Sequence, residues 1–471
     1  MYRPSPVEHS KTSEVKWGQL KERWVGWGVE IPGEQSWARP SVLLESPENV
    51  TASSLTTSTG QPLLPNAVHS KYPLPGRGGD YLGALIKVYD EVSYRPASTY
   101  TFVGIVSSST MPSPFSSDNS EEPVTVPAIH VLAGPEVGYP IIAKALPEID
   151  ASPIMDIRPA LIDYLATAFN PPDPFAAEYL LLLLISNASA RPASLRPLGT
   201  LAVNFLRSAS SGSTSDFTSI ISSVTPLVVP LPLSISLLHS ANFSPVSNEF
   251  SSLDAGLLQL GAGTVLIVEE DEMKEGGQLG EKAVKNLRAL VDCTSQQNVR
   301  YEYPYMEGLK MDCDVKVAVL SEGNSLLPAD VRIPLSSTVN DQTLRRNTSA
   351  AELKAFRDYL VKHSSTMHCS RLVIPEDVSL RIQDDFVRSR KAGALRSDAR
   401  ERNVDKGVEI AEDKLKRQMR VARLLALSYP AARLNMSVWE RTVALDEEVD
   451  ARVLKRGTER RDAKLGKRDA A

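Results

Sequence analysis

Two short stretches contain residues whose types and spacing could support nucleotide chemistry. In the first, the apolar run Gly263–Val268 ends in four acidic residues, Glu269–Glu272. A short apolar run predicts a buried strand, and the acidic residues would lie where its carboxyl end meets solvent. P-loop nucleotidases hold Mg²⁺ with acidic residues at this position. A metal–nucleotide site is therefore one hypothesis, and a solvated acidic turn is the favoured alternative.

The second stretch is the loop Arg207–Ser215. It follows a predicted strand, Gly199–Leu206, and precedes a helix that we expect Asp216 to cap, which is the geometry of a phosphate-binding loop. Such a loop needs Gly-x4-Gly-Lys-Ser/Thr, because glycines let backbone N–H groups wrap the phosphates and the lysine neutralises their charge. This loop has one glycine and no lysine. We therefore expect no tight ATP binding, and assign no catalytic residue, no metal ligand and no cofactor.

The elements around the acidic run predict an α/β core over residues 151–335. Leucines and alanines recur at helical spacing in Gln278–Gln296, and valines alternate in Val315–Val319. Strand, helix and strand in this order predict a parallel α/β unit. The stretch Phe175–Ala188 is apolar nearly all round, which predicts a buried helix, and Asp173 before Pro174 is a suitable N-cap.

Other catalytic signals are weak. The chain has no Gly-x-Ser-x-Gly elbow and no His-Glu-x-x-His motif. His363, His368 and Cys369 are close in sequence, but a cluster at a helix end is more often incidental than a metal site. Cys293 and Cys313 are distant from it and form no CxxC pair, so neither a zinc site nor a disulfide framework is indicated.

Length and charge set wider bounds. At 471 residues the chain can hold two or three domains. Its net charge of −5 is uneven, since from Arg388 onward there are 22 Lys/Arg against 14 Asp/Glu. A solvated helical face is one interpretation of this basic end, and contact with nucleic acid or an acidic partner is the other. We see no signal peptide at the start, and Tyr179–Ile185 is shorter than the ~20 residues of a membrane span. We expect a soluble intracellular protein.

The first 150 residues divide by composition into a Trp-rich segment (1–40), a Ser/Thr/Pro linker (41–79) and a β-rich region (80–150). Within them we predict strands at Trp24–Val29, Asp80–Asp90, Tyr100–Val106 and Ala128–Leu132. The second and third of these are expected to pair across a turn at Arg95–Ala97. The segment 107–122 is expected to be a disordered loop. A small β-barrel of the oligonucleotide-binding kind is one arrangement that fits.

The C-terminal part predicts a helical lid over residues 336–455 and a basic, frayed tail over 456–471. Two Ser-x-x-Glu capping boxes, at Ser349 and Ser437, predict helix starts. Further helices are expected from Pro375 to about Arg390 and from Glu409 to about Tyr429. The charged segment Ala394–Gly407 has no apolar periodicity.

Several blocks resemble the minichromosome maintenance complex-binding protein family. Ala176–Leu182 (AAEYLLL) and Ser321–Asp330 (SEGNSLLPAD) carry the most specific resemblance. The N-terminal blocks, PGEQSW from Pro32 and LIKVY from Leu85, are looser. Further matching blocks are PLG from Pro197, GLLQL from Gly256, GQL from Gly277 and VARLLALS from Val421. Together they cover most of the chain from Trp24 to Val449. Members of this family usually carry a longer N-terminal region.

The resemblance implies a fold and a function. The fold would be a degenerate P-loop, AAA-like α/β core similar to a helicase subunit, with a barrel-like N-terminal part and a helical lid. Helicase subunits carry an arginine finger in a Ser-Arg-Phe-Asp context, and the nearest stretch here, Leu327–Asp330, offers no arginine. The function would be non-enzymatic binding of helicase subunits in the nucleus. It would serve assembly, stabilisation or unloading of the helicase on chromatin in DNA replication, and sister-chromatid cohesion.

Two alternatives stay open. A working ATPase would need a lysine from elsewhere, and Lys274 and Lys282 are the near candidates. A DNA-binding module would stack bases on aromatic residues and would line its groove with cations. Lys87 and Arg95 are almost the only cations among the candidate aromatic residues Tyr81, Tyr89, Tyr94, Tyr100 and Phe102. We therefore expect no direct DNA binding, only indirect contact with chromatin, and no membrane association.

Overall fold

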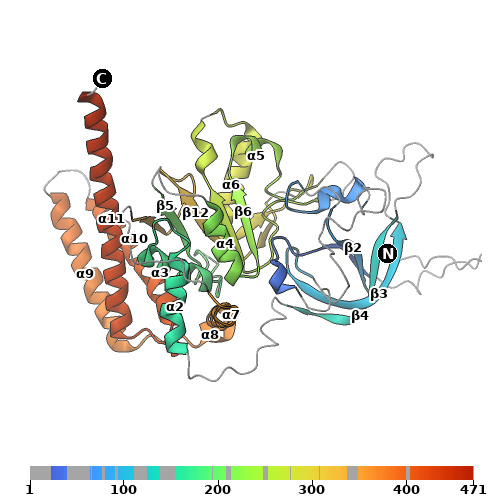
Figure 1. Cartoon of the computed structure of the whole chain (residues 1–471), viewed down its shortest axis with the longest axis horizontal. Helices are drawn as coiled ribbons and strands as arrows, with labels where there is room; N and C mark the ends of the chain where they lie inside the picture. Colours follow the sequence, from blue (N-terminus) through green and yellow to red (C-terminus); the bar gives the residue numbers. More distant parts are fainter. Residues whose placement is uncertain are drawn as a thin grey trace, which may run out of the picture.

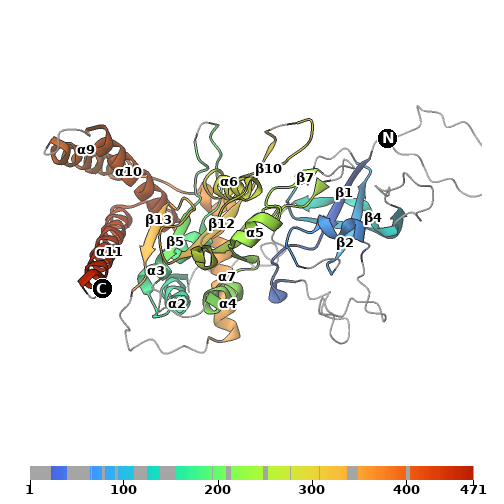
Figure 2. The same cartoon turned by 90° about the horizontal axis from the view of Figure 1, so that it is seen from above.

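A computed structural model gives the fold of the chain in three successive regions. It describes residues 23–39, 64, 66–76, 80–90, 94–110, 125–137, 154–193, 195–207, 214–247, 253–275, 277–306, 308–336, 348–398 and 404–469. An N-terminal sheet, a central parallel sheet with its helices, and a group of long C-terminal helices follow one another along the longest axis (Figures 1 and 2).

The N-terminal sheet has four strands in the order β1-β2-β4-β3. They are β1 (Trp24–Val29), β2 (Gly83–Val88), β3 (Tyr100–Thr110) and β4 (Thr125–Val137). The prediction that the strand at Tyr100 pairs with the strand before it was wrong. Instead, β4 lies between β2 and β3. One edge of β4 pairs with β3 in antiparallel orientation along nearly its whole length, and the other edge pairs with β2 in parallel orientation. No pairing between β1 and β3 closes the described strands into a barrel.

Part of the predicted linker is packed against this sheet. The 3₁₀ helix η5 (Asn66–Lys71) places Val68 beside Tyr72 and Tyr81, and all three side chains are buried. Most of 41–79 lies outside the described residues. The predicted disordered loop needs a similar correction, because residues 107–110 continue β3, whereas 111–124 lie outside the described part.

The central sheet has five parallel strands in the order β13-β5-β12-β9-β6. Its members are β5 (Ala202–Leu206), β6 (Val228–Pro232), β9 (Thr264–Glu269), β12 (Val315–Ser321) and β13 (Val331–Pro334). Counted along the chain, this order is 5-1-4-3-2. The helix α6 (Glu281–Gln296) connects β9 to its parallel neighbour β12, which confirms the predicted strand–helix–strand unit.

Helices cover both faces of this sheet, and each face has its own apolar cluster. One face packs on α2 (Ile154–Ala166), α3 (Pro174–Ile185), α4 (Thr214–Val224) and α7 (Ala350–Ser364), and the other on α5 (Ile235–Ser240) and α6. As its sequence predicted, α3 is buried along its length. Asp173 caps α3 by accepting hydrogen bonds from the N–H groups of Phe175 and Ala176 at 3.1 and 3.2 Å.

The C-terminal helices are α8 (Thr366–Ser370), α9 (Glu376–Asp398), α10 (Val404–Leu427) and α11 (Met436–Asp469). The capping box at Ser349 is confirmed. The one at Ser437 was wrong, because α11 begins a residue earlier and the Asn435 side chain accepts from Val438 N at 2.9 Å. The segment around Ala394 is largely helical, and Asp216 lies inside the first turn of α4 instead of capping it. Two hairpins, β7 (Val246–Ser247) with β8 (Leu253–Asp254) and β10 (Asn298–Arg300) with β11 (Lys310–Asp312), complete the core.

The described helices include both long charged helices and shorter apolar ones. None of them combines the length and the apolar character that crossing a membrane requires.

Candidate functional site

The carboxyl edge of the central sheet brings together the two stretches that the sequence singled out. β5 and β9 both lie beside β12, so the loop after β5 and the acidic run after β9 meet at one edge. Arg207, directly after β5, forms an ion pair with Asp271, which opens the 3₁₀ helix η6 (Asp271–Glu275). Residues 208–213 of the loop lie outside the described part of the chain.

Within the acidic run, Glu270 is buried whereas Glu272 is exposed. Glu270 is 8% exposed and accepts hydrogen bonds from Ser325 Oγ at 2.8 Å and from Leu326 N at 3.1 Å. Burial raises the pKa of Glu270, and these hydrogen bonds offset part of that shift. The prediction of a solvated turn was wrong for Glu270, because the loop after β12 folds over its carboxylate, and it holds for the exposed Glu272.

A second cation at this edge comes from the C-terminal helix α11. Arg456 of α11 donates hydrogen bonds to the carbonyl oxygens of Leu206 at 2.6 Å, Arg207 at 2.5 Å and Glu322 at 2.9 Å. The expectation of a frayed tail from residue 456 was therefore wrong at its first residue. Nothing in the local sequence around Arg456 indicated these contacts.

The donors at this edge do not fit a P-loop site for a magnesium nucleotide. Arg207 and Arg456 are engaged with protein groups, and Glu270 is turned to Ser325. Lys282, one of the lysines considered for an ATPase, donates to Ser240 O in α5 at 2.8 Å. Throughout the described ranges, no three His, Cys, Asp or Glu side chains are grouped so that they could hold a metal ion.

The cluster at the end of α7 is part of the protein interior. The ring of His363 stacks on Tyr359 and donates from Nδ1 to Tyr359 O at 2.8 Å, and burial lowers the pKa of His363 to about 4. His368 donates from Nε2 to Leu427 O at 2.9 Å. Cys369 lies 3.6 Å from the amide nitrogen of Asn187. These contacts hold α7 and α8 against α3 and α10.

The other two cysteines are neighbours in space, which their separation in sequence concealed. Cys293 in α6 and Cys313 before β12 are buried free thiols whose sulfur atoms are 3.8 Å apart. The neighbouring Cys293 thiol and burial raise the pKa of Cys313, so the Cys313 thiol is a packing group and not a reactive nucleophile.

The aromatic residues considered for stacking nucleotide bases mostly pack within the protein. Tyr94 is buried against Trp24, Tyr100 and Phe102. Tyr81 is buried under η5. Tyr89 is exposed, but its hydroxyl hydrogen-bonds to His130 at 2.5 Å. The nearby cation Lys87 is itself buried and donates to Ser109 Oγ at 2.9 Å.

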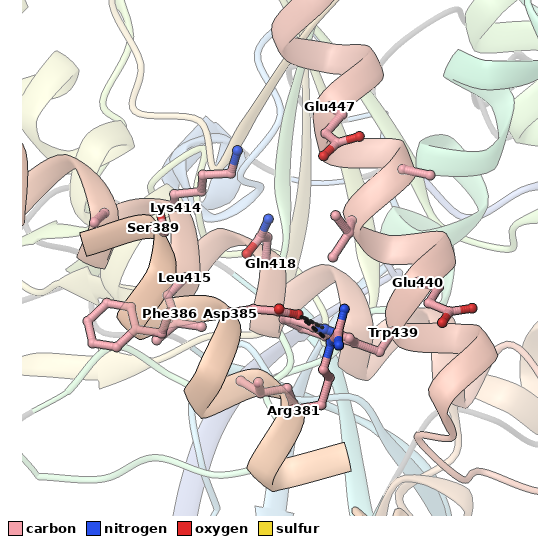
Figure 3. Close-up of a pocket in the computed structure, with 14 residues that line it drawn as sticks. Arg381, Asp385, Phe386, Ser389, Lys414, Leu415, Gln418, Trp439, Glu440 and Glu447 are labelled. Atoms are coloured by element: carbon pink, nitrogen blue, oxygen red, sulfur yellow. Dashed lines mark hydrogen bonds and ion pairs between the residues drawn. The ribbon is translucent and has the colours of Figure 1, made fainter. Parts of the chain in front are cut away.

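A groove between the last three helices had no signal in the sequence. It encloses a cavity of about 360 Å³. Figure 3 shows that Arg381 and Asp385 come from α9, Lys414 and Gln418 from α10, and Trp439, Glu440 and Glu447 from α11. The remaining lining residues are Ile382, Phe386, Ser389, Ala411, Leu415, Val443 and Ala444.

The fold and its carboxyl edge define an α/β protein with a five-stranded parallel sheet that is covered by helices on both faces. The family model described as "Mini-chromosome maintenance replisome factor" matches residues 44–453. The chain therefore belongs to this family.

Relatives in distant organisms agree with this assignment. The chain is 29% identical to the mini-chromosome maintenance complex-binding protein of Salmo salar over 412 residues, covering 80% of this chain and 63% of that protein. The human protein of that name is 28% identical over 437 residues, covering 83% and 64%. The one from Arabidopsis thaliana is 25% identical over 397 residues, covering 79% and 63%. The chain thus spans slightly less than two thirds of the length of these relatives.

Proposed function

We propose that this protein binds subunits of the mini-chromosome maintenance helicase during DNA replication and does not hydrolyse nucleotide. The names of its relatives support the partner. The proposal that the protein does not hydrolyse nucleotide rests on the carboxyl edge of the central sheet, where polar side chains are already paired with protein groups. There Asp271 binds Arg207, Glu270 binds Ser325, and Arg456 binds three backbone carbonyl groups.

The strand order supports a common origin with the ATPase core of helicase subunits. An ATPase of the P-loop class needs its phosphate loop and its acidic strand end at one edge of the sheet. Here β5 and β9 flank β12 and deliver the corresponding stretches to one edge. We propose that the core is a degenerate AAA-like ATPase that has kept this shape and lost the chemistry. A shape of this kind can dock beside helicase subunits of similar architecture.

We further propose that the protein acts in the nucleus, where it assembles, stabilises or unloads the helicase on chromatin and contributes to sister-chromatid cohesion. This step rests on the family resemblance. Fluorescence microscopy of the tagged protein, with chromatin fractionation after its rapid depletion, tests it. A cytoplasmic signal, or unchanged helicase on chromatin through a full S phase, would refute this part.

The binding proposal is tested with purified helicase subunits and no nucleotide. Capture of at least one subunit at micromolar concentration is expected, and ATP should leave the affinity unchanged. Leu266→Asp places a charge in the buried strand β9, so it should unfold the core and abolish capture. Calorimetric titration with Mg-ATP should give a Kd weaker than about 1 mM, a binding free energy of ~4 kcal/mol at most. Tighter nucleotide binding would contradict the proposal.

A further inference from the structure

The groove between α9, α10 and α11 has an apolar floor. Ile382 and Phe386 of α9, Leu415 of α10 and Val443 of α11 line it together with small side chains. Grooves of this kind between packed helices are where amphipathic helices bind.

Most of the charged groups around the groove are already paired. Asp385 accepts hydrogen bonds from Trp439 Nε1 at 3.0 Å and from Arg381 Nε at 3.2 Å (Figure 3). Lys414 forms ion pairs with Asp446 at 3.5 Å and Asp450 at 3.4 Å. These cations are therefore neutralised by the protein itself.

Two carboxylates that line the groove from α11 differ from the other charged groups because they are not paired within the described residues. Glu440 and Glu447 are exposed, and no hydrogen bond or ion pair to another described residue involves either of them. A separation of seven residues places both on one face of α11, about 10.5 Å apart along its axis. The groove thus presents an apolar floor beside two unmatched negative charges.

The walls of the groove are held in place before any partner arrives. Arg417 of α10 binds Asp446 at 2.6 Å and Asp450 at 3.1 Å, and Gln418 binds Asp446 at 2.9 Å. These contacts fix the angle between α10 and α11. A preformed groove binds with less loss of conformational entropy than one that must be ordered on binding.

We propose that this groove binds an amphipathic helix that carries two Lys or Arg residues seven positions apart beside a row of apolar side chains. The helix would belong to a helicase subunit, so this inference rests on the proposed function. Basic side chains at that spacing would match Glu440 and Glu447, while the apolar row would fill the floor. An acidic helix would be repelled by the same two carboxylates.

The test is a charge reversal on the groove with a matched control. Glu440→Lys/Glu447→Lys should weaken capture of the bound helicase subunit about tenfold or more at 100 mM salt, and should flatten its salt dependence. Asp384→Lys/Glu412→Lys makes the same change of net charge at exposed positions on α9 and α10 that do not line the groove, and should change the affinity less than about twofold. Ala444→Trp should weaken capture by filling the floor. Circular dichroism and thermal melting of each variant check that it is folded.

The outcomes separate the two proposals. If wild-type protein captures helicase subunits and the folded groove variants capture them equally well, the groove proposal is refuted while the proposed function stands. If wild-type protein captures no subunit, the proposed function fails and the groove proposal fails with it. If light scattering shows a wild-type dimer that the groove variants dissociate, the occupant is a second copy of this chain and the proposal is wrong.

Discussion

Arg158 of α2 donates a hydrogen bond to the carboxylate of Glu178 in α3 at 2.7 Å. The other carboxylate oxygen of Glu178 accepts from Arg441 of α11 at 2.6 Å. Glu178 is only 5% exposed, so one buried carboxylate joins three helices. These two contacts explain how the otherwise apolar helix α3 accommodates an acidic residue.

Removal of this carboxylate should destabilise the protein strongly. Glu178→Ala leaves the mostly buried guanidinium of Arg158 without its carboxylate partner, whereas Arg441 is half exposed and can be solvated, and we expect a loss of about 3 kcal/mol in the free energy of unfolding. Urea denaturation followed by circular dichroism measures it. Glu412→Ala, at an exposed position on α10, should cost less than about 0.5 kcal/mol. Similar values for the two variants would show that the carboxylate contributes little.

Arg456 should be needed to hold the far half of α11 on the core. Arg456→Met removes the guanidinium group that donates hydrogen bonds to three backbone carbonyl oxygens, and we expect a loss of about 2 kcal/mol in the free energy of unfolding. Amide hydrogen exchange in α11 after Glu448 should become faster. Lys455→Met changes an exposed neighbour and serves as the control. Unchanged exchange in Arg456→Met would contradict this role.

Lys316 should make stability rise with pH. Its ammonium group donates to Leu184 O, and burial lowers the pKa of Lys316 from 10.5 to about 8. Between these values the unfolded chain binds more protons than the folded one, so the free energy of unfolding increases with pH. The increase from pH 7 to 9.5 should be about 2 kcal/mol. Urea denaturation of the wild-type protein and of Lys316→Met at each pH measures this, and the variant should lack the increase in the free energy of unfolding. If the free energies of the two proteins changed with pH in parallel, this role of Lys316 would be refuted.

His363 should make stability fall in mild acid. Burial lowers the pKa of His363 from 6.5 to about 4, so between these values the unfolded chain takes up a proton that the folded chain does not. From pH 7 to pH 5 the free energy of unfolding should fall by about 2 kcal/mol through this group. His363→Phe keeps a ring stacked on Tyr359 and should be less sensitive to acid. An equal loss of stability in the wild-type protein and in His363→Phe would show that another group causes the acid sensitivity.

Features that depend on neighbouring residues could be predicted from the sequence. The unit β9–α6–β12 follows from apolar runs and helical spacing, and the caps at Asp173 and Ser349 follow from residue types at fixed offsets. Each of these signals is local. The sequence therefore supplied most of the elements of the central region and the two stretches that meet at its carboxyl edge.

Features that join distant residues could not be predicted. The insertion of β4 between β2 and β3 depends on which strand edges are free after folding, and the separate strand patterns do not encode that. Arg456 reaches Leu206 across 250 positions, and the Cys293–Cys313 contact depends on how α6 packs. Three helices must pack before the groove exists. An arginine in a basic tail and a glutamate on a helix look like solvated charges until their neighbours are known.

The order of the central sheet also governs how the protein can be made. β5 is an inner strand, yet both of its neighbours, β12 and β13, are translated long after it. The second ion-pair partner of Glu178 comes later still, because Arg441 follows 263 positions after it. During most of elongation the apolar helix α3 is therefore present without β12, β13 and α11, and Glu178 has Arg158 as its one ion-pair partner until the last helix emerges. A chain that terminates before α11 should therefore fail to fold and should be bound by chaperones or degraded by proteases.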